Sequence, residues 1–295
     1  MTERWESIRL ADGRTLEAVI QGADRGTLLI FHHGSPGAAQ PFGPFDRAAA
    51  ERDVVLAFPS RAGFGGSDRQ EGRAVASVAA DAAALADHLG HERFLTAGWS
   101  GGGPHALACA ALLPDRVLAA ATIAGVAPYD ADGLDWTAGM GEDNQIEYPL
   151  AARDPQALLE WMQPHAEAMA SIEPEEIIHE FASLISPVDA GELTGEFGEA
   201  FAASLRAAFR NGPWGWYDDD LAFVGNWGFD VARIRVPVTI WQGAQDLMVP
   251  IAHGEWLAAN IPDARPELRP EHGHLSLAVG SFGGVLDDLL HDAGV

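Results

Sequence analysis

The stretch Phe94-Leu95-Thr96-Ala97-Gly98-Trp99-Ser100-Gly101-Gly102-Gly103-Pro104 decides how this chain is organised. Its apolar first half predicts a buried strand, and the residues after Ser100 predict a helix that stops before Pro114. Between them stands Gly-x-Ser-x-Gly, the pattern of a nucleophile elbow. The bend needs glycines because a side chain there would collide with neighbouring backbone. Since the bare pattern also occurs in ordinary turns, the rest of the chain must support Ser100 as a nucleophile.

Composition limits the class of protein. The chain has 295 residues with 47% hydrophobic content, enough for one α/β domain with an insertion or for two small domains. No apolar run approaches the roughly 20 residues of a membrane span, and the polar N-terminal segment is unlike a secretory signal. The lone Cys109 excludes an internal disulfide and fits a reducing cytoplasm, so we expect a cytoplasmic protein.

Charge excludes further classes. All 18 basic residues are arginines, which excludes lysine Schiff-base chemistry and Walker-type phosphate loops. The formal net charge of −25 argues against nucleic acid or an anionic membrane as a partner. We therefore expect a small-molecule substrate, no metal and no cofactor, and we leave a homo-oligomer open. Residues 129–228 hold 20 acidic residues and three arginines, which suggests a separate structural unit.

Strand-like and helix-like runs alternate outside that acidic segment. This alternation predicts a mostly parallel sheet with helices on both faces, whereas residues 129–228 are helix-like and aromatic. We therefore predict a core domain over 1–128 and 229–295 and a helical cap, or lid, over 129–228. Asp12-Gly13 predicts a hairpin turn. The expected strands lie at 4–10, 15–21, 27–32, 54–58, 94–99, 117–124, 236–241 and 266–269, and the expected helices at 75–89, 101–113, 251–260 and 276–291.

A serine nucleophile needs an imidazole to take its proton and an acid to orient that imidazole. Asp246 follows a predicted strand, and His274 lies in a loop after the last strand-like run, so both belong at the carboxyl edge of the sheet. Asp246 could instead cap the helix that follows. Asp130 is the alternative acid, and His272 is the nearest rival of His274.

Two backbone N–H groups are candidates for an oxyanion hole. His33-Gly34-Ser35-Pro36-Gly37 follows the strand expected beside the elbow, and its glycines allow a tight turn. The backbone N–H groups of Ser35 and Gly101 can face a developing oxyanion, and Gly101 gains from the helix N-terminus. We expect the backbone of Ser35, and not its hydroxyl group, to matter; an ordinary Gly-Pro turn is the alternative.

These elements together resemble the α/β-hydrolase superfamily, in its lidded serine-nucleophile form. The matching segments are residues 33–37, 61–68, 98–102, 243–250 and 273–274, in the family's order. The resemblance implies the α/β-hydrolase fold, with about eight strands and a cap inserted after the sixth. It also implies that Ser100, Asp246 and His274 form a triad and that Ser35 and Gly101 donate to the oxyanion.

The resemblance leaves the substrate open. Proline iminopeptidases share the His-Gly-x-Pro-Gly segment and an acidic cap, but their elbow usually reads Gly-Gly-Ser-Trp-Gly, whereas this one reads Gly-Trp-Ser-Gly-Gly. Epoxide hydrolases and haloalkane dehalogenases place an aspartate at the elbow, so Ser100 argues against both. Cofactor-free haloperoxidases and C–C bond hydrolases use the same triad and stay open. A non-enzymatic small-molecule receptor is the alternative from another class.

We predict cleavage of an ester-like acyl bond in a small, neutral and partly apolar substrate through an acyl-enzyme. Trp99 and Trp214 are candidate contacts with an apolar substrate. Glu142, Asp143 and Glu147 lie early in the insertion and would bind a substrate amine if they face the site. The run Asp218-Asp219-Asp220 predicts a solvated acidic turn, because three adjacent carboxylates cannot all converge on a metal.

Overall fold

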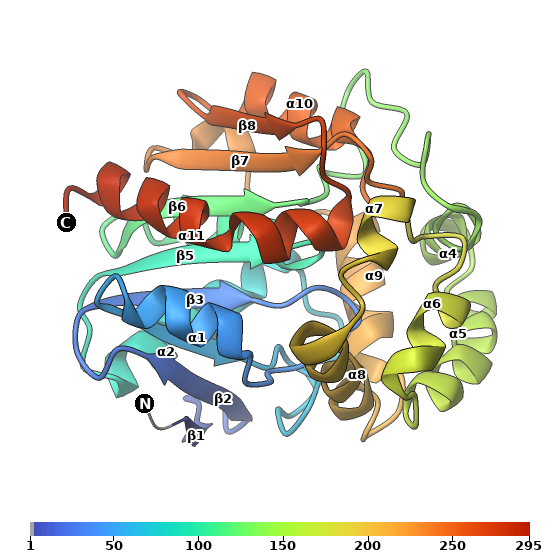
Figure 1. The fold of residues 1–295 in the computed structure, drawn as a ribbon, viewed down its shortest axis with the longest axis horizontal. Coiled ribbons are helices and arrows are strands. Elements are labelled where there is room, and N and C mark those ends of the chain that lie inside the picture. The colour runs from blue at the N-terminus through green and yellow to red at the C-terminus, as the bar shows by residue number, and fades with distance from the viewer. Residues whose placement is uncertain (1–2) are drawn as a thin grey trace.

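An eight-stranded sheet forms the centre of the molecule in the computed structural model, which describes residues 3–295 (Figure 1). The first two residues of the polar N-terminal segment lie outside the described part. The strand order is β1-β2-β4-β3-β5-β6-β7-β8. The first two pairings, β1 with β2 and β2 with β4, are antiparallel, and all the others are parallel. The predicted α/β-hydrolase sheet is therefore confirmed.

The eight strands lie within a few residues of their predicted positions. Parallel strands are covered on both faces and read as continuous Val/Ile/Leu runs, which is why the central strands stand out in the sequence. The hairpin turn at Gly13 has φ +90°, a conformation that favours glycine. The strands are β1 (Arg4–Arg9), β2 (Thr15–Gly22), β3 (Thr27–His32), β4 (Val54–Pro59), β5 (Phe94–Trp99), β6 (Val117–Ile123), β7 (Val238–Gly243) and β8 (Arg265–Arg269).

Helices cover both faces of this sheet. One face carries α1 (Gly43–Ala50) and α11 (His274–Ala293), and the other carries α2 (Val78–His88), α3 (Gly102–Leu112) and α10 (Ile251–Asn260). A stacked pair, Phe45 on Phe282 with ring centroids 3.7 Å apart, joins α1 to α11. The final helix begins at His274, two residues before its predicted start, so it includes the candidate base.

The acidic segment between β6 and β7 folds into helices that gather beyond the carboxyl ends of the strands (Figure 1). We call residues 129–228 the lid. Its apolar cluster includes Met162 and Leu205, and it packs on Phe64 and Leu275 of the core. Whether the lid is a separate domain stays a prediction. Its α-helices are α4 (Glu142–Arg153), α5 (Pro155–Met169), α6 (Ile177–Glu180), α7 (Pro187–Ala190), α8 (Gly195–Ala208) and α9 (Trp214–Val224). Within residues 3–295, no helix is both long and apolar enough to cross a membrane.

Candidate active site

The candidate nucleophile lies at a sharp turn between β5 and α3. Ser100 has φ +56°, a left-handed conformation that a non-glycine residue rarely adopts. A Cβ atom on Gly98 would overlap the carbonyl of Gly102, and one on Gly102 would overlap the carbonyl of His32. The Ser100 N–H donates to the Ile123 carbonyl at 2.8 Å, which ties the turn to β6. The glycines are therefore required by close backbone approach, as the sequence pattern predicts.

The candidate base and acid form a buried hydrogen-bonded pair. Nδ1 of His274 lies 2.8 Å from Oδ2 of Asp246, and both side chains are buried. Oδ1 of Asp246 accepts the backbone N–H groups of Met248 and Val249 at 2.8 and 2.7 Å, which fixes the carboxylate. Burial raises the pKa of Asp246, and the His274 imidazole opposes that shift. Near the nucleophile, the Trp99 indole donates to the His274 carbonyl at 3.3 Å, so the pair lies against the elbow.

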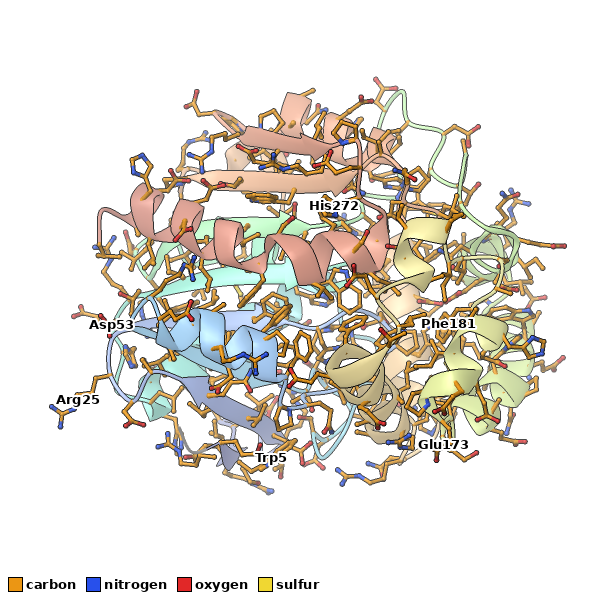
Figure 2. All side chains as sticks on the ribbon, in the orientation of Figure 1. Trp5, Arg25, Asp53, Glu173, Phe181 and His272 are labelled. Carbon is orange, nitrogen blue, oxygen red and sulfur yellow. The ribbon has the colours of Figure 1, made fainter. Side chains whose placement is uncertain are left out.

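The two rival residues lie elsewhere. Asp130 is exposed, next to a different cavity formed with Trp227 and Trp256. His272, labelled in Figure 2, lies in the loop before α11, with Nε2 3.9 Å from the Glu271 carboxylate. The carboxylate that contacts the candidate base is therefore Asp246.

The two candidate oxyanion segments lie side by side. A Cβ atom built on Gly101 would lie 2.9 Å from Cβ of Ser35, so these backbones approach closely. Gly101 stands at the N-cap position of α3, where the positive end of the helix favours an anion. Ser35 and Ser100 both line the same cavity. The buried Ser35 hydroxyl has no hydrogen-bond partner among the described residues.

A buried network of arginine and aspartate side chains holds the loop that contains Ser35. The Arg61 guanidinium donates to the carbonyls of His33 and Gly34. Asp219 of the lid helix α9 accepts from Arg61 at 2.6 Å and from Arg73 at 2.5 Å. Burial alone would raise the pKa of Asp219, but the two guanidinium groups outweigh it and hold the pKa far below its usual range. The lid is therefore linked to the candidate oxyanion segment through Asp219 and Arg61.

This network overturns the expected solvated turn at residues 218–220. The three carboxyl groups are buried on α9. Asp218 pairs with Arg69 at 2.7 and 2.8 Å, Asp219 pairs with Arg61 and Arg73, and Asp220 lies beside Glu147 of α4. The sequence shows the acidic run but not its arginine partners, which precede it by roughly 150 positions. Among residues 3–295, no three His, Cys, Asp or Glu side chains group as metal ligands would.

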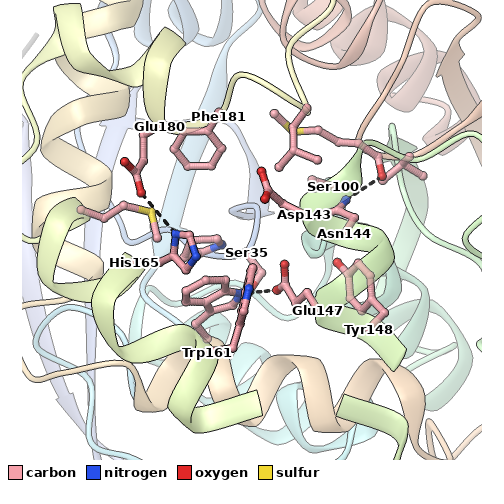
Figure 3. Close-up of a pocket in the computed structure, with 16 residues that line it drawn as sticks. Ser35, Ser100, Asp143, Asn144, Glu147, Tyr148, Trp161, His165, Glu180 and Phe181 are labelled. Atoms are coloured by element: carbon pink, nitrogen blue, oxygen red, sulfur yellow. Dashed lines mark hydrogen bonds and ion pairs between the residues drawn. The ribbon is translucent and has the colours of Figure 1, made fainter. Parts of the chain in front are cut away.

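A cavity between the elbow and the lid contains both predicted and unpredicted residues (Figure 3). Asp143 and Glu147 of α4 line it, opposite Trp161 and His165 of α5. Glu142 is exposed and does not line it, contrary to expectation. Because 143 and 147 are four residues apart, they share a helix face, whereas residue 142 is turned away. The spacing of residues 143 and 147 in the sequence is therefore a signal that they face the cavity together.

The two tryptophans predicted to contact substrate do not line this cavity. Trp214 is 37% exposed, and the Arg69 guanidinium lies 4.2 Å above its ring, so it packs at the rim of the lid. Trp99 lines a second, mainly apolar cavity with Phe42, Phe197 and Phe201. Its neighbour Ser100 lines the first cavity instead, because the chain leaves β5 at the sharp turn where Ser100 has φ +56°.

Three carboxyl groups make the first cavity acidic. Glu147 is buried and accepts from the Trp216 indole at 2.6 Å, and burial raises its pKa. Asp143 accepts from the Ser183 hydroxyl at 2.5 Å, and Glu180 lies 3.3 Å from the His165 imidazole. Glu180 and His165 were not singled out from the sequence. They lie on α6 and α5, and only the folded lid brings them together.

A family model described as alpha/beta hydrolase fold matches residues 27–281. The chain is 33% identical over 118 residues to the uncharacterized hydrolase YcgS of Bacillus subtilis strain 168, a match that spans 40% of each chain. Epoxide hydrolase A from Mycobacterium thermoresistibile superposes with a TM-score of 0.71, at 23% identity over 98% of both chains. A bromoperoxidase from Bacillus anthracis gives 0.70, at 20% identity over 98% of this chain and 100% of that one.

The buried Asp220 carboxyl yields a prediction about stability. Burial and the neighbouring Glu147 raise the pKa of Asp220 well above its usual value. The folded state therefore binds a proton more tightly than the unfolded state. The contribution of Asp220 to stability is therefore greatest below its pKa in the unfolded chain, about 4, and it falls as pH rises towards its pKa in the folded protein. The loss is about 1.4 kcal/mol for each pH unit between these two pKa values.

Asp220→Asn cannot ionise, so its free energy of unfolding should fall less steeply above pH 4 and equal or exceed the wild-type value near pH 8. Urea unfolding between pH 4 and 8 measures both slopes. The control Asp218→Asn breaks the pair with Arg69 and should lower stability at neutral pH. Parallel curves for wild type and Asp220→Asn would show that Asp220 is ionised at neutral pH.

Proposed function

Since the chain belongs to the alpha/beta hydrolase fold family, we propose that it is a serine hydrolase that cleaves an ester-like acyl bond. The observation that carries this proposal is the elbow, which holds Ser100 at φ +56° on the wall of a cavity. Epoxide hydrolases and haloalkane dehalogenases have an aspartate at this position. Because this chain has a serine there, acyl transfer to Ser100 is the better proposal. The hydrogen-bonded pair of Asp246 and His274 supports the same reaction.

The proposed reaction runs through an acyl-enzyme. Ser100 Oγ attacks the carbonyl carbon while Nε2 of His274 takes its proton, and the same proton then passes to the leaving group. A water molecule, deprotonated by His274, then attacks the acyl carbon, and His274 returns that proton to Ser100 Oγ as the bond to the acyl group breaks and the acid leaves. The bond from Nδ1 to Asp246 fixes the imidazole with Nε2 free to accept, and the carboxylate stabilises the imidazolium that forms.

The negative oxygen of the tetrahedral intermediate would accept from the backbone N–H groups of Ser35 and Gly101. Donors fixed before reaction stabilise such charge without reorganisation, which is often the largest catalytic effect. The network of Asp219 and Arg61 supports this role because it braces the carbonyl groups of His33 and Gly34, which precede Ser35.

The substrate of this proposal is a small molecule with an apolar or aromatic part. Trp161, Phe181, Met169 and Leu184 line the cavity beside Ser100, so part of the substrate would be desolvated there. The reaction as written needs no metal or cofactor. We keep the cytoplasm as the proposed location, in line with a single, buried, free cysteine.

A second candidate function is favoured by the acidic wall of the cavity. Of the three early lid acids, Asp143 and Glu147 line this cavity. Carboxylates beside aromatic rings suit an ammonium group. If one of them binds a substrate amine, the enzyme is an aminopeptidase resembling the proline iminopeptidases. The raised pKa of Glu147 argues the other way, because a protonated carboxyl group attracts a cation less strongly.

Replacing the nucleophile tests the proposed reaction. Ser100→Ala should lower kcat for p-nitrophenyl acetate by roughly 10⁴-fold or more, since the acyl-enzyme can no longer form. Thermal unfolding should stay close to wild type because alanine keeps the backbone of the turn. Turnover by a folded Ser100→Ala variant at the wild-type rate would overturn the serine mechanism. Dialysis against a chelator should leave wild-type activity unchanged.

The amine hypothesis predicts a different pattern of specificity. We expect kcat/KM for a neutral short-chain aryl ester to exceed that for a prolyl arylamide with a free amine. Acetylating the amine of the arylamide should then change kcat/KM little. Glu147→Gln tests the cavity carboxyl, and Glu142→Gln, an exposed residue of the same helix, is its matched control. A strong preference for the free amine that only Glu147→Gln abolishes would make the aminopeptidase the better assignment.

A further inference from the structure

A buried carboxylate of the lid contacts the first turn of the helix that carries the candidate base. Asp189 belongs to α7, and its side chain is fully buried. Its Oδ2 accepts the backbone N–H of His274 at 2.9 Å. Its Oδ1 accepts the N–H groups of Leu275 and Ser276, each at 2.9 Å. The hydroxyl groups of Ser186 and Ser276 donate to the same carboxylate at 2.8 and 3.0 Å.

Helix α11 has no N-cap side chain that could accept from its first N–H groups, and Asp189 of the lid supplies this acceptor. The first N–H groups of a helix have no partner within it, and a side chain at the N-cap position usually accepts from one of them. Here the N-cap residue is Gly273, which has no side chain. A Cβ atom at Gly273 would overlap the Asp189 carboxylate, although its φ of −99° suits any residue. Glycine is therefore required by the approach of Asp189.

The charge of Asp189 lies at the positive end of the helix that carries His274. The N-terminus of a helix carries a partial positive charge, which opposes a proton on a side chain in the first turn. His274 is the first residue of the 20-residue α11. Burial alone would raise the pKa of Asp189, but the N–H groups of Ser276 and His274 outweigh it and hold the pKa below its usual value. An ionised Asp189 therefore offsets the helix field at the imidazole.

The other titratable side chains near this turn come from the loop after β7 and from the loop that precedes α11. Asp246, in the loop after β7, contacts Nδ1 of His274. His272 lies in the preceding loop beside Glu271 and approaches Gly280, in the second turn of α11. The side chain contacting His274 from β5 is the uncharged indole of Trp99. Asp189 is thus the charged side chain that binds the backbone of the candidate base.

We propose that Asp189 is a positioning residue for the hydrolysis: it holds the backbone of His274 in place and stabilises the protonated imidazole. This inference rests on the proposed function, because it assumes that His274 is the base. It gives the lid a part in the chemistry, since α7 cannot leave the core without removing the acceptor from the first turn of α11. We therefore expect α7 to stay in contact with α11 during turnover, even if other helices of the lid move.

The test substitution is Asp189→Asn, which keeps the shape of the side chain. Its amide oxygen can still accept from Leu275 and Ser276, but its NH₂ group cannot accept from His274. For p-nitrophenyl acetate we expect kcat to fall roughly 100-fold with KM little changed, because a small displacement of a catalytic group has this effect. The acid limb of the kcat/KM profile should move to lower pH by about half a unit or more, since a nearby negative charge is lost.

The control is Asp154→Asn. Asp154 is a carboxylate N-cap of α5, far from His274 in the chain, and it accepts from Ala157 at 3.1 Å. The Asp154→Asn substitution should leave both kcat and the pH profile unchanged.

Gly273→Ala is the second test variant, because its methyl group should displace Asp189 without removing the charge. Gly273→Ala should lower kcat but shift the acid limb less than Asp189→Asn does. The double variant Gly273→Ala with Asp189→Ala should have a kcat little below that of either single variant, because both substitutions remove the same contact.

Two results would overturn the proposal. One is a folded Asp189→Asn variant whose kcat and acid limb match the wild type, even if its melting temperature falls. The other is full additivity of Gly273→Ala and Asp189→Ala. Amide hydrogen exchange at residues 274–276 separates this failure from a failure of the proposed function. Faster exchange in Asp189→Asn should appear whether or not Ser100 is a nucleophile, and unchanged exchange would show that the contact itself is absent.

Discussion

The backbone at Ser100 constrains everything around it. A residue at φ +56° between a strand and a helix is strained, and it persists only where the surroundings hold it. Here the carbonyl groups of His32 and Gly102 approach so closely that Gly98 and Gly102 have no room for a side chain. The bond from Ser100 to Ile123 joins the turn to the next strand. As a result, the hydroxyl group stands at the carboxyl edge of the sheet, where the loops after β3, β7 and β8 meet it.

The lid stabilises those loops through buried carboxylates. Asp219 on α9 binds Arg61, which in turn holds the segment before Ser35. Asp189 on α7 binds the first turn of α11, where His274 lies. Buried charges are costly unless they are paired, so separating lid from core at either point would leave arginines or backbone N–H groups without partners. The acidic composition of the lid therefore serves, in part, to hold the core in place.

The sequence predicted the core well because each of its signals is local. Central strands are short apolar runs, the elbow is a contiguous motif, and Asp246 and His274 follow strands in an order that the motif requires. The sequence could not show the roles of Asp189 and Asp219. Their partners lie 85 and 158 positions away, at His274 and Arg61. The acidic run at 218–220 predicts a solvated turn for the same reason, whereas the spacing of residues 143 and 147 is a local signal that places both on one helix face.

Covalent labelling shows whether Ser100 is an activated nucleophile. The protein is incubated with a fluorophosphonate at neutral pH, and the intact mass and the modified peptide are determined by mass spectrometry. We predict one adduct per chain, on Ser100, that forms much more slowly in His274→Ala. An unmodified protein, or an adduct on another residue with Ser100 free, would contradict it.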